Sequence, residues 1–157
     1  MKFIKILFLI LQITSHHKVD GSELYIIRFY GITQDPETKN YIMVLDYAEN
    51  GSLRNFLDKY DDLSWETKIR FLWYIASVLR DIHEKELIHR DLHIGNILSF
   101  SSYYTRITDM GLCKPADYNK LENTNNNNNV YGVLPYIAPE ILRGQNYTKA
   151  ADVYSFV

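Results

Sequence analysis

The sequence predicts one domain of the α+β class. Its 157 residues fit a single domain, and a hydrophobic share of 46% is enough for a core. Two runs rich in β-branched and aromatic residues, 26–32 and 41–45, predict strands. A long apolar stripe over residues 65–84 predicts a helix. These features together indicate a small sheet beside a mainly helical region.

The first strands and the first helix are separated by residues that break regular structure. Pro36 and Asn40 lie in the segment between the two strands, so the strands are expected to form a hairpin. Asn50 and Gly51 end that hairpin. Ser52 is a suitable N-cap for a helix over residues 53–59.

The long helix is expected to begin after Ser64, a second N-cap residue, and to run to Glu84. Apolar residues recur in it at steps of three and four, which is typical of a helix with one buried face. The stripe consists of Ile69, Leu72, Ala76, Leu79 and Ile82 and is widened by Phe71, Ile75 and Val78. We therefore expect burial over much of the helix circumference.

The second half of the chain contains two short predicted strands, 97–99 and 106–108, and an apolar helix that starts near residue 150. Between them, residues 113–130 are polar and include five consecutive asparagines, 125–129. Such a segment lacks the apolar surface needed to order itself, so we expect a mobile loop there.

Composition restricts the partners and the compartment. The formal net charge of -2 gives no electrostatic reason to expect nucleic acid or an anionic membrane as a partner. Cys113 is the lone cysteine, which excludes an internal disulfide framework and suits a reducing compartment. We therefore expect a cytoplasmic protein.

The N-terminus has two interpretations. Lys2 and Lys5 precede an apolar run, 6–11, as in a short signal peptide. The run is too short to span a bilayer, and no convincing small-x-small cleavage site follows it. We favour a buried helix. The alternative, a secreted or membrane-anchored protein with residues 1 to about 15 as its targeting segment, stays open.

Three ordered motifs carry the chemistry. His89-Arg90-Asp91 is followed by Asn96, then by Asp109-Met110-Gly111, then by Ala138-Pro139-Glu140. An Asp and an Asn five residues apart, followed by a second Asp, provide a proton acceptor and two magnesium ligands. These are the groups that phosphoryl transfer from ATP needs. Three such motifs in this order are far more specific than any one of them.

On these motifs the chain resembles a eukaryotic protein kinase domain of the tyrosine-kinase-like branch. The resemblance covers residues 1–157 and implies a kinase-like α+β fold. Residues 1–45 would be a remnant of the N-terminal lobe, with one helix and the β-hairpin; 46–50 would be the hinge. Residues 51–157 would be an incomplete, mainly helical C-terminal lobe. No counterpart of the family's glycine-rich loop or of its phosphate-binding lysine is found, so we expect a chain truncated at both ends.

The resemblance assigns catalytic roles to Asp91, Asn96 and Asp109. Asp91 would be the catalytic base that accepts the proton of a substrate hydroxyl. Asn96 and Asp109 would bind Mg²⁺ through hard oxygen atoms, and Mg²⁺ offsets the charge that develops on the phosphates. Asp152 would hold the catalytic loop by accepting backbone N–H groups, although an Asp near a helix start is also a simple cap.

The resemblance also places the nucleotide. The backbone of Asp46 and Ala48 would meet the adenine edge, Leu45 would be the gatekeeper residue, and Leu98 would lie under the purine. Arg90 would face a phosphate on the activation segment. Tyr131 and Thr124 are the candidates to carry that phosphate.

Two departures bear on specificity. His93 stands where serine/threonine kinases carry a lysine, and Val133 where they carry a threonine. The sequence therefore does not decide whether the acceptor hydroxyl belongs to Ser/Thr or to Tyr, and we favour Ser/Thr. Because the phosphate-gripping lysine and its glutamate partner are missing, with Ile6 at the place of the glutamate, we expect this chain alone to bind ATP weakly and to turn over slowly.

The expected function is transfer of the ATP γ-phosphoryl group to a protein hydroxyl in signal transduction, with ATP, Mg²⁺ and a protein substrate. A partner protein would cover the apolar surface left by the missing part of the lobe. The alternative function is a pseudokinase that binds a partner without catalysis, using that same apolar surface.

Overall fold

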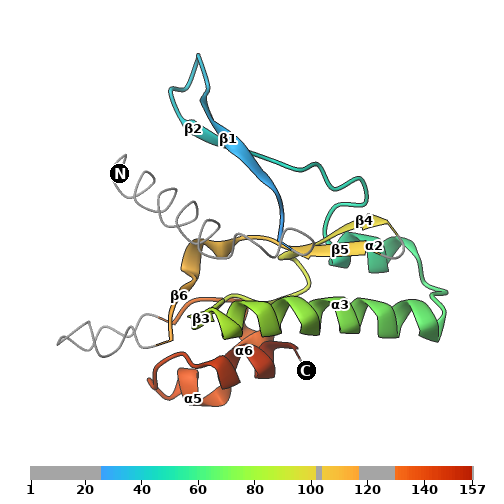
Figure 1. Cartoon of the computed structure of the whole chain (residues 1–157), viewed down its shortest axis with the longest axis vertical. Coiled ribbons are helices and arrows are strands. Elements are labelled where there is room, and N and C mark those ends of the chain that lie inside the picture. The colour runs from blue at the N-terminus through green and yellow to red at the C-terminus, as the bar shows by residue number, and fades with distance from the viewer. Residues whose placement is uncertain (1–25, 102–103, 117–129, 157) are drawn as a thin grey trace.

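The computed structural model describes residues 26–101, 104–116 and 130–156 (Figure 1). The N-terminal segment, expected to be a helix or a targeting signal, lies outside the described residues, as do residues 117–129 of the predicted 113–130 loop. The start of that predicted loop is ordered instead: Cys113 is buried in the core, and Lys114–Pro115 pair with Leu87–Ile88 as a short strand.

Strands form small antiparallel pairs, and helices make up most of the rest, so the α+β prediction is confirmed. The strand pairs of the described residues are β1–β2, β3–β6 and β4–β5. Figure 1 shows the β1–β2 hairpin standing apart from the helices. Residues 53–156, called the helical part below, contain all the other elements. In chain order the elements are β1 (Phe29–Gln34), β2 (Tyr41–Leu45), α2 (Leu53–Lys59), α3 (Trp65–Glu84), β3 (Leu87–Ile88), β4 (Ile97–Ser101), β5 (Tyr104–Ile107), the 3-10 helix η1 (Met110–Leu112), β6 (Lys114–Pro115), the 3-10 helix η2 (Leu134–Tyr136), α5 (Pro139–Leu142) and α6 (Lys149–Phe156).

The hairpin begins later than the sequence predicts. The expected strand starts at Ile26, whereas β1 starts at Phe29. Ile26 and Ile27 are instead buried in the main core, where Ile26 forms a parallel bridge with Ile107 and the N–H of Ile27 donates to the Ile107 carbonyl at 3.0 Å. The start of the predicted strand is therefore part of the core, and only the residues from Phe29 onward belong to the hairpin.

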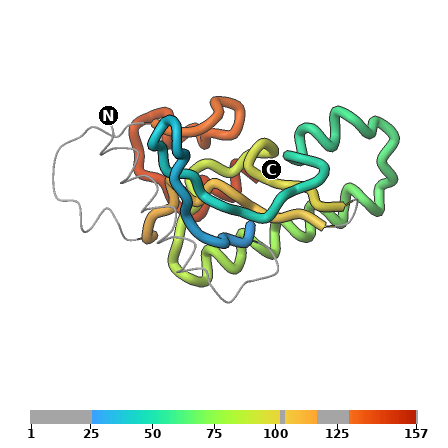
Figure 2. The backbone as a smooth tube through the Cα atoms, turned by 90° about the horizontal axis from the view of Figure 1, so that it is seen from above, coloured from blue at the N-terminus to red at the C-terminus, as the bar shows by residue number. Residues whose placement is uncertain are grey.

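The turn of the hairpin is stabilised locally. The Oδ1 atom of Asp35 accepts hydrogen bonds from the N–H groups of Glu37 and Thr38, at 2.8 and 3.1 Å. Such a carboxylate is a common way to satisfy the backbone of a tight turn. Seen from above, the chain leaves the hairpin and runs to α2 along the cyan-to-green segment (Figure 2).

Both predicted N-caps are confirmed. Ser52 Oγ accepts from the N–H of Asn55 at 3.3 Å, and Ser64 Oγ accepts from the N–H of Thr67 at 3.2 Å. A capping hydroxyl satisfies one backbone donor that the first helical turn leaves unpaired. The predicted bounds of α2 and α3 match those observed.

The predicted buried stripe of α3 is partly wrong. Ile69 and Leu72 are 60% and 51% exposed, and Ala76 is exposed as well. The residues that were expected only to widen the stripe form the buried face together with Leu79 and Ile82, because β5, β3 and α6 pack on that side. The buried apolar side chains of α3 are Phe71, Ile75, Val78, Leu79 and Ile82.

The main core joins the start of the described chain to the helices. Most of its buried members come from the segment before β1, from α2 and α3, and from the strands β3, β4 and β5. A second cluster joins β3 to the residues that follow η2, to α5 and to α6. Its members are Ile88, Ile137, Ala138, Ile141, Tyr147 and Ala151.

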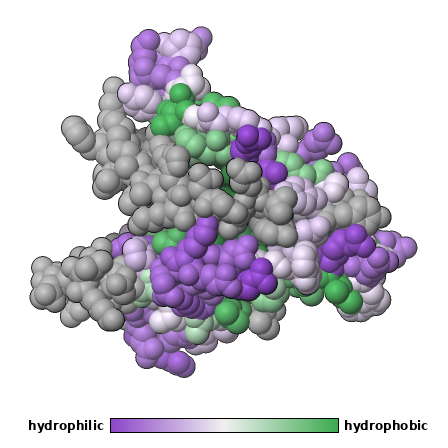
Figure 3. Space-filling model, viewed as in Figure 1, coloured by the Kyte–Doolittle hydropathy of each residue, from purple (hydrophilic) through white to green (hydrophobic). Residues whose placement is uncertain are grey.

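Among the described residues, the β1–β2 hairpin has no comparable core. On the face drawn in Figure 3, hydrophobic residues reach the surface below the hydrophilic hairpin tip. Its exposed apolar side chains are Tyr30, Ile32, Tyr41, Ile42 and Val44. Within the described residues, every helix is too short or too polar to cross a membrane.

Candidate functional site

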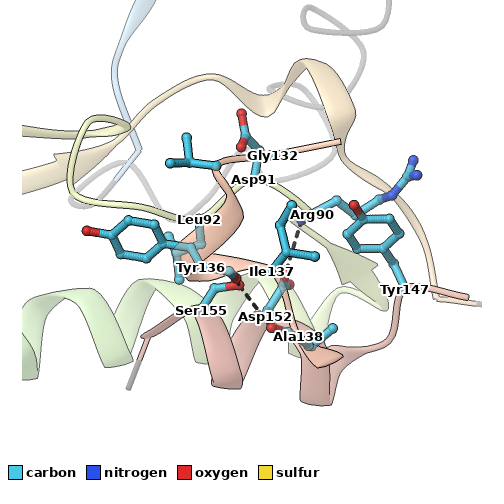
Figure 4. A pocket seen from close by; sticks show the side chains of 12 residues that line it. Arg90, Asp91, Leu92, Gly132, Tyr136, Ile137, Ala138, Tyr147, Asp152 and Ser155 are labelled. Atoms are coloured by element: carbon cyan, nitrogen blue, oxygen red, sulfur yellow. Dashed lines mark hydrogen bonds between the residues drawn. The ribbon is translucent and has the colours of Figure 1, made fainter. Parts of the chain in front are cut away.

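The site is built around residues 89–96, called the 89–96 loop below, which connects β3 to β4. Arg90 has a φ of 73°, a left-handed conformation that residues other than glycine seldom adopt. The loop keeps this shape because Asp152 on α6 holds it. Asp152 Oδ2 accepts from the N–H of His89 at 2.8 Å. Its Oδ1 accepts from the N–H of Arg90, also at 2.8 Å (Figure 4). The expected anchoring role of Asp152 is therefore confirmed.

A second histidine, which the sequence did not point to, completes the surroundings of Asp152. His83 on α3 lies with Nε2 at 2.9 Å from Asp152 Oδ2. Asp152 is only 1% exposed, so its charge depends on these polar partners for stability. The carboxylate thus joins α3, α6 and the 89–96 loop.

His89 links the loop to the segment before Asp109. It is fully buried, its Nε2–H donates to the Thr108 carbonyl at 3.2 Å, and its Nδ1 accepts from the N–H of Asp91 at 3.3 Å. Burial lowers the pKa of His89, although Asp152, Asp91 and Asp109 act in the opposite direction. A neutral imidazole with one donor and one acceptor fits both bonds.

Asp91 has one occupied and one unoccupied carboxylate oxygen. Its Oδ2 atom and its backbone carbonyl both accept from Asn96 Nδ2, at 3.1 and 2.9 Å. Its Oδ1 atom is buried and has no hydrogen-bond partner within the described part of the chain. A buried oxygen without a partner is costly, and it is a strong acceptor for an incoming hydroxyl.

The surroundings of this Oδ1 atom are restricted on two sides. His93 Nε2 lies 3.7 Å away. Gly132 also lies beside it, and a Cβ there would be 3.4 Å from Oδ1, an ordinary contact distance. Its φ of +116° is a backbone conformation that other residues rarely adopt, so the backbone shape of the segment, rather than lack of space, favours glycine. Figure 4 shows Gly132 beside Asp91 at the edge of a small cavity.

His93 is held in one orientation. Its Nδ1 atom accepts from the N–H of Gly95 at 3.0 Å, which places the hydrogen of a neutral imidazole on Nε2, on the side of Asp91. A Cβ on Gly95 would lie 2.7 Å from His93 Cε1. Glycine at position 95 is thus needed for this ring position, a requirement that sequence reasoning missed.

Asn96 and Asp109 are brought together by backbone pairing. The N–H of Thr108 donates to the Asn96 carbonyl at 2.9 Å, and Asp109 follows Thr108 directly. Asp109 has a φ of 60° at the start of η1. Because Asn96 uses Nδ2 to bind Asp91, its Oδ1 atom is left as an acceptor on the other side of the amide.

The oxygen atoms of Asn96 and Asp109 fit Mg²⁺. An amide oxygen and a carboxylate are hard ligands, and Mg²⁺ commonly takes one or two protein ligands and completes its shell with water and phosphate oxygens. Within the described residues, no group of three or more His, Cys, Asp or Glu side chains could hold a metal. A cation at this pair would therefore depend on a bound nucleotide for further ligands.

The residues expected to contact adenine gather beside the β4–β5 sheet. Leu45, at the end of β2, and Leu98, on β4, are both half-buried and pack against the main core. Ser52 forms an isolated bridge with Leu98, which brings the end of the 46–50 segment to the same strand. Since β4 begins directly after Asn96, this strand connects the two groups of predicted site residues.

The backbone of the 46–50 segment has free polar groups. The N–H of Asp46 donates to the Arg28 carbonyl at 3.0 Å. In the described part of the chain, no residue donates to the Asp46 carbonyl or accepts from the N–H of Ala48. These are the two groups expected to meet the adenine edge.

Arg90 faces the segment that returns to the loop. Its guanidinium lies 4.5 Å from the ring centre of Tyr147 and 5.9 Å from that of Tyr131. The Tyr147 hydroxyl bonds to the backbone of Tyr131, accepting from its N–H at 2.9 Å. Arg90 therefore lies beside one of the two predicted phosphate carriers; Thr124 lies outside the described residues.

Comparison with known proteins identifies the family. The model of the protein kinase domain matches residues 10–157. The chain belongs to the protein kinase family. This membership explains the order of the three motifs and the presence of Asp91 and Asn96 on one loop.

Relatives from Dictyostelium discoideum and Arabidopsis thaliana are named as kinases or as a kinase-like protein. A protein named as a probable serine/threonine-protein kinase in Dictyostelium discoideum is 31% identical over 83% of this chain and 7% of its own length. L-type lectin-domain containing receptor kinase V.5 of Arabidopsis thaliana is 34% identical over 83% of this chain and 20% of its own length. Serine/threonine-protein kinase-like protein CCR4 of the same plant is 32% identical over 83% of this chain and 18% of its own length. The chain thus spans a fifth or less of the length of these relatives.

Proposed function

We propose that this kinase chain transfers the γ-phosphoryl group of ATP to a hydroxyl of a protein substrate, as part of signal transduction. The observation that carries the proposal is the buried Asp91 Oδ1 atom, which has no hydrogen-bond partner in the described chain while Oδ2 is fixed by Asn96. One oxygen positions the carboxylate, and the other is left to accept a proton.

In the proposed reaction, the substrate oxygen forms a bond to the γ-phosphorus as the bond from that phosphorus to the ADP oxygen breaks. The hydroxyl proton passes to Asp91 Oδ1, and ADP leaves with the electron pair of the broken bond. Mg²⁺, when bound, would offset the charge on the phosphates. Asn96 and Asp109 would hold it through Oδ1 and the carboxylate.

The fixed geometry of the 89–96 loop supports this role. Catalysis by positioning needs groups held in place before the substrate arrives. Asp91 is held by Asn96 through its side chain, and by His89 through its N–H, while Asp152 fixes the loop that carries it. The nucleotide would bind along β4, with Leu45 and Leu98 around the purine and the backbone of Asp46 and Ala48 at its edge.

The acceptor is proposed to be serine or threonine. One relative reported above is named a probable serine/threonine-protein kinase and another a serine/threonine-protein kinase-like protein, which supports this choice. Receptor kinases among the relatives are compatible with the tyrosine-kinase-like branch. Because His93 and Val133 replace the residues that serine/threonine kinases usually carry, tyrosine remains the alternative acceptor.

The second candidate function is a binding module without catalysis. Exposed apolar side chains on both the hairpin and α3 favour it. A partner that covers these side chains would explain their exposure.

A transfer assay separates the two functions. The chain is incubated with radiolabelled ATP, Mg²⁺ and a generic protein acceptor such as casein, and the labelled amino acid is identified after hydrolysis. Asp91→Asn should lower transfer by about 10²- to 10⁴-fold without changing stability. Asp62→Asn, which changes an exposed carboxylate, is the matched control and should leave transfer unchanged.

The possible results are distinct. Label on serine or threonine that disappears in Asp91→Asn supports the proposed kinase. Label that persists in Asp91→Asn does not come from this site and contradicts it. Absence of transfer from the unaltered chain, together with capture of a partner on the hairpin surface, favours the binding module.

A further inference from the structure

The 46–50 segment joins the hairpin to the helical part, and its two ends are tied by backbone hydrogen bonds. The N–H of Asp46 donates to the Arg28 carbonyl at 3.0 Å, and the N–H of Asn50 donates to the Ser99 carbonyl at 3.2 Å. Between these ends, Tyr47 is 84% exposed. Within the segment, the Ala48 carbonyl accepts from the N–H of Gly51 at 3.0 Å. The side-chain contacts of Asp46 add to these backbone bonds in setting the shape of the segment.

The carboxylate of Asp46 contacts both parts of the molecule. Its Oδ1 atom accepts from the Tyr30 hydroxyl, on β1, at 2.5 Å. Its Oδ2 atom pairs with the guanidinium of Arg106, on β5. One side chain thus connects the hairpin with the β4–β5 sheet, across 16 residues on one side and 60 on the other.

Contacts with residues other than Asp46 also fix the orientation of the Arg106 side chain. Its Nε–H donates to the Tyr104 hydroxyl at 2.9 Å. The guanidinium also lies over the rings of Phe100 and Tyr104, 5.0 and 5.2 Å from their centres. Aromatic rings on a guanidinium reduce its freedom and favour the charged form. Asp46 therefore meets a fixed cation.

Electrostatics agree with this geometry. The hydrogen bond from Tyr30, opposed by burial and helped by the guanidinium of Arg106, lowers the pKa of Asp46. The same bond to the Asp46 carboxylate is the main cause of the raised pKa of Tyr30. Asp46 and Arg106 are mostly shielded from water, with side chains 21% and 16% exposed. Such a pair is less screened by salt than one on the open surface.

We propose that Tyr30, Asp46 and Arg106 form a latch between the hairpin and the helical part, which holds the 46–50 segment in the shape that recognises an adenine nucleotide. This inference rests on the proposed function. The latch uses the side chain of Asp46, whereas nucleotide recognition uses its carbonyl and the N–H of Ala48, which no described residue occupies. Tyr30 and Arg106 are therefore positioning residues.

Amide hydrogen exchange in the absence of nucleotide tests the latch by itself. Arg106→Met keeps the length of the side chain and removes the charge; Tyr30→Phe removes only the hydroxyl. Exchange of the Tyr47, Ala48 and Glu49 amides should become about tenfold faster in Arg106→Met and about threefold faster in Tyr30→Phe. Tyr41→Phe, on an exposed hairpin tyrosine, is the matched control and should show no change.

Titration with ADP tests whether the latch serves nucleotide recognition. The dissociation constant should rise by about three- to tenfold in the same two variants, and Arg106→Lys, which keeps the charge, should recover part of the loss. Thermal melting of each variant checks that it folds. If Arg106→Met does not fold, Tyr30→Phe and Arg106→Lys carry the comparison.

Two results would overturn the latch. Unchanged exchange in Arg106→Met and Tyr30→Phe would show that the contacts do not hold the segment. Faster exchange with an unchanged ADP dissociation constant would show that they hold it without serving nucleotide binding. If the unaltered chain does not bind ADP, the proposed kinase function fails, while hydrogen exchange still decides whether the three side chains hold the segment.

Discussion

The helical part and the β1–β2 hairpin are held by different kinds of contact. The helical part has a buried core, and the buried carboxylate of Asp152 holds its 89–96 loop. The hairpin exposes apolar side chains along both of its strands, and Asp46 ties its end through a partly exposed ion pair. The comparison indicates that the helical part provides most of the stability of the fold. The contacts of the hairpin serve instead to position the 46–50 segment.

The largest effect should come from the buried anchor. Asp152→Ala removes the acceptor for the N–H groups of His89 and Arg90 and the partner of His83, and it leaves the left-handed Arg90 without support. We expect the free energy of unfolding to fall by about 3–5 kcal/mol. Urea denaturation measures it. Asp62→Ala, at an exposed carboxylate, is the control; a similar small loss in both variants would contradict the anchor.

A core substitution in α3 should rank next. Ile82 is fully buried on the face that packs in the main core. Ile82→Ala should cost about 2–4 kcal/mol, because it removes apolar contacts and leaves a cavity. Ile69→Ala changes the same residue type on the exposed face and should cost under about 1 kcal/mol. Equal losses at the two positions would mean that a partner or another part of the protein covers Ile69.

Stability should also depend on pH through His89. Its folded pKa is depressed, so below its ordinary pKa of about 6.5 the unfolded chain binds a proton that the folded chain refuses. The stabilising contribution is complete above this pH and is lost as pH falls towards the lower folded pKa. His89→Phe removes this titration. The free energy of unfolding of the unaltered chain should fall more steeply between about pH 7 and pH 5 than that of His89→Phe. Parallel curves would exclude this source of acid sensitivity.

The smallest effect is expected in the hairpin. Ile32 is exposed on β1, so Ile32→Ser should change the free energy of unfolding by less than about 0.5 kcal/mol. Chemical denaturation of this variant beside Ile82→Ala gives the direct contrast between the two regions. A loss above about 2 kcal/mol at Ile32 would show that the hairpin is packed as tightly as a core.

Local signals in the sequence predicted the local structure. Ser52 and Ser64 cap their helices because a serine hydroxyl reaches a backbone N–H only three residues away. The hairpin turn is likewise set by Asp35 and its near neighbours. Such contacts need no knowledge of the rest of the fold, and the predicted bounds of both capped helices were correct.

Long-range contacts were not predictable in the same way. Periodicity placed Ile69 and Leu72 on the apolar stripe of α3, but the packing of β5, β3 and α6 decided which side is buried. The pairing of Asp46 with Arg106 joins residues 60 positions apart, and no spacing rule indicates it. Asp152 was assigned correctly only because the family motif supplied a long-range contact that the sequence pattern lacks.

The most direct test is a crystal structure of the chain with Mg²⁺ and a non-hydrolysable ATP analogue. We predict Mg²⁺ at about 2.0–2.1 Å from an oxygen of Asn96 and from one of Asp109. Asp91 Oδ1 should point towards the γ-phosphate, and the adenine edge should contact the Asp46 carbonyl and the Ala48 N–H. A nucleotide bound elsewhere, or a cation coordinated without Asn96 and Asp109, would contradict the proposed kinase site.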